Sequence, residues 1–123
     1  TITNQEHKIA VKNGKPFFYE PQNLKNAKAK LTDSLIGHVP PRKISGPIRL
    51  MVKWCFPAAG HPDGSWKVTK PDTDNLEKML KDCMTLVGYW NDDAQVVSEI
   101  TEKFWAEIPG IYIRIDELHG MRT

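Results

Sequence analysis

Apolar and polar residues alternate from Ile48 to Phe56, whereas from Leu76 to Val87 apolar residues recur at every third or fourth position. Period-two alternation predicts a half-buried strand, and the second spacing predicts an amphipathic helix with one full apolar stripe. A loop over residues 57–71 separates the two segments. A chain that changes period in this way packs a helix against a sheet, so we expect a mixed class of fold.

The segments on either side add a second helix and further strands. Apolar residues recur at helical spacing over 22–36, and Gly37 follows at the position of a C-terminal cap. Residues 39–47 form a basic connector that is too rich in proline for either regular structure. Residues 94–105 and 111–115 are rich in valine and isoleucine, and we expect these last two strands to pair antiparallel.

The N-terminal third carries weaker patterns. Ile9 and Val11 alternate ahead of an Asn13-Gly14 turn signal, which indicates a short hairpin. We expect residues 1–20 to form an irregular or incomplete N-terminal segment. The chain as a whole, residues 1–123, is expected to be a single domain of α/β class (α+β type), with a small mixed four-stranded sheet and two main helices.

Composition narrows the setting. With 40% hydrophobic and 26% charged residues, the chain resembles an ordinary soluble protein and has no tract long enough to span a membrane. Its first residues lack the apolar run of a secretory signal. Cys55 and Cys83 have no metal-type spacing and are expected to be reduced and buried. A cytoplasmic location is therefore expected.

Two acidic clusters bracket the second helix. Asp72 and Asp74 stand at its start, and Asp92 and Asp93 follow its end. Carboxylates two residues apart can converge on a hard divalent cation such as Mg²⁺. The alternative is structural, because Asp74-Asn75-Leu76-Glu77 also matches a capping box, although this leaves Asp72, Asp92 and Asp93 unexplained. From spacing alone, metal binding and capping remain equally open.

Lys78 lies four residues after Asp74, one turn along the same helix face. It is either an exposed ion pair of little energetic value or a cation beside a metal-bound carboxylate that stabilises negative charge on a phosphate. Other chemistries find less support. The four histidines form no zinc-type pair, and no serine lies in a nucleophile motif.

Charge is divided unevenly along the chain. Residues 1–70 hold 12 Lys or Arg against 4 Asp or Glu, whereas residues 71–123 hold 5 against 11. Such a division indicates a basic surface for a polyanion beside an acidic patch that would repel it without bound metal. It also arises by chance in small domains.

The motif block from Asp72 to Val97 resembles the RusA-type Holliday junction resolvases, a family of Mg²⁺-dependent endodeoxyribonucleases common in phages and prophages. The family pattern is D-x-D-N-L-x-K, a helix, then G-[aromatic]-x-x-D-D-x-Q-[V/I], and the chain meets every element of it. The resemblance covers residues 48–116 well and the helix over 22–36 in position only.

The resemblance implies a function and its residues. Asp72, Asp74 and Asp93 would be the metal-binding catalytic carboxylates, with Asp92 accessory and Lys78 the essential basic residue. The implied activity is Mg²⁺-dependent hydrolysis of DNA phosphodiesters, with Mn²⁺ able to substitute, in recombination and repair. A homodimer is implied too, because a four-way junction is resolved by paired, symmetrical nicks.

Helix length adds a constraint of its own. The helix over 75–87 rises about 20 Å, so Asp72 and Asp93 leave opposite ends of it. Either the loop after Gly88 returns sharply along the helix, or a dimer partner supplies part of each site. We favour the second arrangement.

Several basic residues are candidates for phosphate contacts, namely Lys25, Lys28, Lys30, Arg42, Lys43, Lys67 and Lys70. Trp66 or Phe56 could wedge at the branch point, although buried aromatics are commoner. Two other functions remain open: a non-catalytic protein that binds branched DNA, and a nuclease of broader specificity that cuts flaps or other branches.

Overall fold

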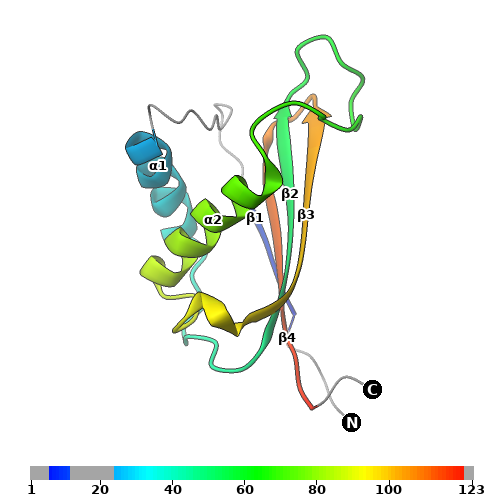
Figure 1. Ribbon diagram of the computed structural model, residues 1–123. Coiled ribbons are helices and arrows are strands. Elements are labelled where there is room, and N and C mark those ends of the chain that lie inside the picture. The colour runs from blue at the N-terminus through cyan, green and yellow to red at the C-terminus, as the bar shows by residue number, and fades with distance from the viewer. Residues whose placement is uncertain (1–5, 12–23, 121–123) are drawn as a thin grey trace.

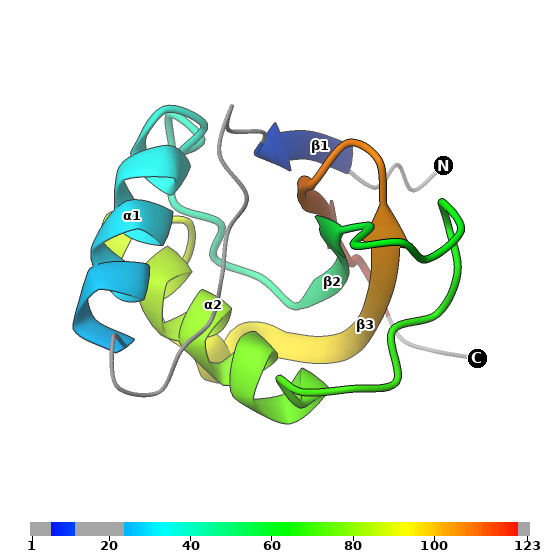
Figure 2. The ribbon, with the colours of Figure 1, turned by 90° about the horizontal axis from the view of Figure 1, so that it is seen from above.

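A computed structural model describes residues 6–11 and 24–120. In chain order the elements are β1 (Glu6–Val11), α1 (Leu24–Ile36), β2 (Ile48–Pro57), α2 (Thr73–Val87), the short 3₁₀ helix η2 (Asp93–Gln95), β3 (Val96–Ala106) and β4 (Gly110–Glu117). Both α-helices lie on one face of the sheet (Figure 1), and the sheet curves around them (Figure 2). The expected mixed α+β fold with two main helices is confirmed.

The strands of the sheet follow the order β1-β4-β2-β3, so β2 is one of its two inner strands. It pairs parallel with β3 and antiparallel with β4. The parallel pair follows from the connection, because α2 crosses over between β2 and β3. Strand β1 pairs antiparallel with β4, and the rest of the expected N-terminal hairpin lies outside the described residues.

The expected pairing of the last two strands is wrong, since β3 and β4 lie on opposite sides of β2. The burial of β2 explains this. Its alternate residues Ile48, Leu50, Val52, Trp54 and Phe56 are all 5% exposed or less. A strand buried so deeply must have its backbone groups paired along both edges, and β3 and β4 provide those two partners.

The core forms where both helices meet the inner face of the sheet. Strand β2 alternates between buried and half-exposed positions along almost its whole length, as the sequence predicted. Helix α2 buries one stripe, and α1 adds a shorter one; their buried apolar residues are Leu76, Met79, Leu80, Cys83, Met84, Ala27, Leu31 and Leu35. None of the helices in the described part of the chain has the length and apolar character needed to cross a membrane.

Helix α2 begins two residues earlier than the sequence indicated, at Thr73, with Asp72 at the N-cap position. It ends where expected: Gly88 has φ 104°, in the left-handed region, and its N–H donates to the carbonyl oxygen of Met84 at 3.1 Å. Fifteen residues make a rigid rod of about 22 Å between the two acidic clusters.

Candidate functional site

The aspartates at the start of α2 do not cap it in the way a capping box requires. Asp72 occupies the N-cap position, yet its side chain accepts no capping hydrogen bond. Asp74 lies inside the first turn, where its Oδ1 accepts from the neighbouring N–H of Asn75 at 3.0 Å. Glu77 is buried and accepts from the hydroxyl of Thr101 on β3, so it cannot reach back to the cap. The predicted capping box is therefore wrong, and the carboxylates of Asp72 and Asp74 are exposed.

The two aspartates of the second acidic cluster, Asp92 and Asp93, have different roles in the fold. Asp92 caps η2, and its Oδ1 accepts from the N–H of Ala94 at 2.8 Å. Gln95 completes this cap, because its side-chain oxygen accepts from the N–H groups of Asn91 and Asp92 at 2.8 and 3.0 Å. Asp93 is half-buried and lies in the first turn of η2.

The loop that carries this cluster is fastened to the rest of the fold. The side-chain nitrogen of Gln95 donates to the carbonyls of Ile44 and Gly46 at 2.8 and 3.0 Å. Tyr89 is fully buried, and its hydroxyl donates to the carbonyl of Leu35, near the end of α1, at 2.6 Å. The position of Asp93 is therefore set by contacts with both α1 and the connector before β2.

The two clusters remain at opposite ends of α2 (Figure 1). The loop after Gly88 turns back beneath α2 into η2 and β3, and η2 lies away from the start of the helix (Figure 1). Within residues 6–11 and 24–120, no three His, Cys, Asp or Glu side chains come together in a group that could hold a metal ion. In the described residues, the turn of the loop after Gly88 therefore does not bring the two acidic clusters of one chain together.

Lys78 extends from the exposed side of α2. Its ammonium lies 3.7 Å from the carboxylate of Asp82, one turn further along the helix, and 78% of its side chain is exposed. An exposed i,i+4 pair of this kind contributes only a few tenths of a kcal/mol. Fold stability therefore does not require a lysine at this position.

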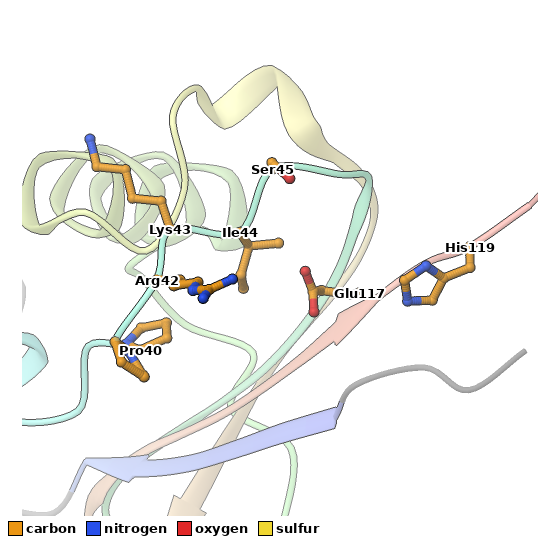
Figure 3. Close-up of a pocket in the computed structure, with 8 residues that line it drawn as sticks. Pro40, Arg42, Lys43, Ile44, Ser45, Glu117 and His119 are labelled. Atoms are coloured by element: carbon orange, nitrogen blue, oxygen red, sulfur yellow. The ribbon is translucent and has the colours of Figure 1, made fainter.

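The basic connector before β2 lines a cavity of about 440 Å³ at the C-terminal end of β4. Its walls are formed by Pro40, Pro41, Arg42, Lys43, Ile44, Ser45, Glu117 and His119. Figure 3 shows Lys43 pointing away from Glu117 and His119. The proline-rich, basic composition of 39–47 indicated a connector, but nothing in the sequence indicated that Glu117 and His119 lie beside it.

The predicted DNA-contacting residues fall into three groups. Lys30, Arg42, Lys43 and Lys70 are exposed and Lys28 is half-buried, whereas the side chain of Lys25 lies outside the described part of the chain. Lys67 departs from the prediction, because it is only 8% exposed and its ammonium is used within the fold. We therefore withdraw Lys67 as a phosphate contact.

The two candidate wedge residues also differ. Phe56 is 5% exposed and belongs to the core, so it cannot enter DNA. Trp66 is 63% exposed and stacks on Phe104 with their ring centroids 4.7 Å apart. Only Trp66 keeps a ring face that DNA bases could reach.

Comparison with known proteins gives consistent matches. The family model for endodeoxyribonuclease RusA matches residues 1–116. A crossover junction endodeoxyribonuclease rusA from Lactococcus phage r1t is 31% identical over 119 residues, which cover 94% of this chain and 89% of the phage protein. An uncharacterized protein, YqaN, from Bacillus subtilis (strain 168) is 31% identical over 121 residues, covering 89% of this chain and 84% of its own.

Proposed function

Because the chain belongs to the RusA endodeoxyribonuclease family, we propose that it is a Mg²⁺-dependent endonuclease that resolves Holliday junctions by paired symmetrical nicks. The reaction is hydrolysis of a DNA phosphodiester, leaving a 5′ phosphate and a 3′ hydroxyl that a ligase can seal. It would serve recombination and repair in the cytoplasm.

One observation carries this proposal: the motif residues divide into those with a structural task and those without one. Gly88 ends α2, Tyr89 anchors the loop, and Asp92 and Gln95 build the cap of η2. The remaining polar members, Asp72, Asp74, Lys78 and Asp93, have no comparable task in the described part of the fold. Motif residues that the fold does not use in this way are the best candidates to bind the metal and the substrate.

The donors fit a hard divalent cation. Asp72 and Asp74 offer exposed carboxylate oxygens at the start of α2, and Asp93 offers a third carboxylate. Oxygen ligands of this type suit Mg²⁺, and Mn²⁺ accepts the same set. When bound, the metal supplies Lewis acidity and lowers the pKa of its coordinated water. Lys78, one turn from Asp74, contacts the scissile phosphate and stabilises its developing charge.

We assign each complete site to two chains of a homodimer. Asp72 and Asp74 of one protomer would meet Asp93 of its partner, because α2, about 22 Å long, separates the two clusters within one chain. A two-fold axis then creates two equivalent sites, as paired nicks require. The exposed Lys30, Arg42, Lys43 and Lys70 and the half-buried Lys28 bind phosphates and position the junction without reading its sequence.

The decisive assay is cleavage of a synthetic four-way junction with Mg²⁺, comparing the wild type with Asp74→Asn and, as a matched control, Asp33→Asn. Asp33 is an exposed aspartate on α1, outside the proposed site. We expect Asp74→Asn to abolish cutting while junction binding is retained, and Asp33→Asn to behave as the wild type. If the wild type binds junctions but does not cut them with any divalent metal tested, the protein is the non-catalytic DNA-binding protein. If it cuts flaps as well as it cuts junctions, it is the nuclease of broader specificity.

Mixing two inactive variants tests the shared sites. In a heterodimer of Asp74→Asn with Asp93→Asn, one composite site carries both substitutions and the other carries neither. We therefore expect the mixture to recover nicking that each variant alone lacks. If every site were built within one chain, both sites of that heterodimer would stay defective and the mixture would remain inactive.

A further inference from the structure

Two lysines hold the backbone that leads into Asp72. We call Lys67 and Lys103 the lysine clamp. Their ammonium groups donate hydrogen bonds to the carbonyl oxygens of Thr69, Lys70 and Pro71, the three residues directly before Asp72. Each of these three carbonyl oxygens therefore accepts a hydrogen bond from a lysine ammonium group.

Lys67 supplies the inner half of the clamp. Its ammonium lies 4.4 Å from the ring centroid of Trp105 and 5.1 Å from that of Phe56. It donates to the carbonyl of Lys70 at 2.7 Å and also to the hydroxyl of Thr69. Burial, and secondly the positive charge of Lys103, lower the pKa of Lys67. A buried cation with both aromatic and carbonyl partners is built into the fold and is not available to a phosphate.

Lys103 supplies the outer half from strand β3. It donates to the carbonyl of Thr69 at 2.7 Å and to that of Pro71 at 2.8 Å. The backbones are joined too, because the N–H of Lys67 donates to the carbonyl of Lys103 at 3.1 Å. The sheet thus fixes the loop, which projects beyond the ends of β2 and β3 (Figure 1).

We propose that the lysine clamp positions the Asp72 carboxylate for its metal ion, and that Lys67 and Lys103 do not contact DNA. The inference rests on the proposed function. The Asp72 side chain does little to fix the position of its own residue. It makes no capping hydrogen bond, and its ion pair is with the exposed ammonium of Lys70, 3.8 Å away. The orientation of its backbone therefore depends on the three carbonyls before it. An ammonium can donate to several of them at once, which a neutral apolar side chain cannot do.

The test compares Lys103→Met with Lys53→Met and Lys103→Arg. Methionine keeps an unbranched apolar stem but removes the donors. Lys53 is half-buried on β2 and pairs with Glu102, the residue before Lys103, so Lys53→Met removes the same charge close by without touching the loop. Arginine keeps the charge and the donors, and should rescue part of the function.

Three measurements separate positioning from DNA contact. Calorimetric titration with Mn²⁺ should show affinity weakened on the order of tenfold in Lys103→Met, the size of effect typical when partners that orient a metal ligand are lost. Backbone ¹⁵N order parameters at Lys70 and Asp72 should fall from about 0.85 towards 0.6. Junction binding in EDTA should equal that of the wild type, and Lys53→Met should change none of the three.

Different results overturn different claims. Weaker junction binding in EDTA with unchanged Mn²⁺ affinity would make Lys103 a phosphate contact and sink the positioning role. If the wild type binds no Mn²⁺ and cuts no junction, the proposed function fails on its own account. The order parameters then decide the clamp by themselves, and unchanged values in Lys103→Met overturn it.

Discussion

Replacing Glu77 by glutamine should stabilise the folded chain at neutral pH and leave its stability in acid almost unchanged. The Glu77 side chain lies between α2 and β3 and is 4% exposed. Its Oε1 accepts from the Thr101 hydroxyl, whereas Oε2 is buried and accepts a hydrogen bond from none of the described residues. A carboxylate in that position lacks much of the solvation it would have in water.

Burial raises the pKa of Glu77 from 4.5 to about 7; the charge of Glu99 adds to the rise, while Thr101 and Lys81 oppose it. Between these two pH values the folded chain holds a proton that the unfolded chain has released, so the free energy of unfolding falls as pH rises. Below 4.5 both states are protonated, and the full stability is present. Above 7 the loss is complete and corresponds to about 3 kcal/mol.

Urea unfolding at about pH 4 and about pH 8 measures this difference. Protein concentration must be the same throughout, because a dimer gains stability with concentration. At about pH 8, Glu77→Gln should be more stable than the wild type by up to about 3 kcal/mol, with near equality at about pH 4. Glu107→Gln makes the same chemical change on an exposed side chain and should alter neither value appreciably. Parallel pH profiles for the wild type and Glu77→Gln would refute the assignment.

Two further substitutions probe the loop that carries Asp93. Gly88→Ala should lower the free energy of unfolding by about 1–2 kcal/mol, because Gly88 has φ 104°, a backbone conformation that alanine adopts only with strain. The new Cβ would meet Lys43 Cε at an ordinary contact distance of 3.5 Å. A far larger loss of stability, measured by thermal unfolding, would therefore contradict a cause in the backbone alone. Gln95→Ala removes four hydrogen bonds and should lower the free energy of unfolding by about 2 kcal/mol. It should also reduce junction cleavage, because the loop that positions Asp93 loses these bonds. Normal cleavage by a destabilised variant would show that the anchoring of this loop does not matter for the reaction.

The sequence predicted best the elements whose side chains repeat with a regular period. The alternation from Ile48 to Phe56 and the stripe from Leu76 to Val87 both report burial directly, and burial is what places β2 and α2. Gly88 was equally readable, because few other residues adopt its backbone conformation.

The failures share a different cause, since each depended on which distant groups meet. Asp74 and Glu77 match a capping box in sequence, but Thr101 on β3 takes up Glu77, and the helix starts at Thr73. In the sequence Lys67 is indistinguishable from a surface lysine, but in the fold its ammonium lies over the rings of Phe56 and Trp105. Local spacing carries no information on such contacts.

The same helix that separates the two acidic clusters also fixes how far apart two proposed cuts would lie. In a dimer with shared sites, one site contains the start of α2 from a given chain, and the other contains the loop after the end of that same helix. The two sites are therefore separated by the distance between the start of α2 and Asp93 within one chain, and the helix, about 22 Å long, is the main element that sets this distance. Both ends of this rod are anchored, by the lysine clamp before Asp72 and by Gln95 and Tyr89 beside Asp93. Paired nicking requires a fixed spacing between two scissile phosphates, and a rigid α2 held at both ends meets that requirement.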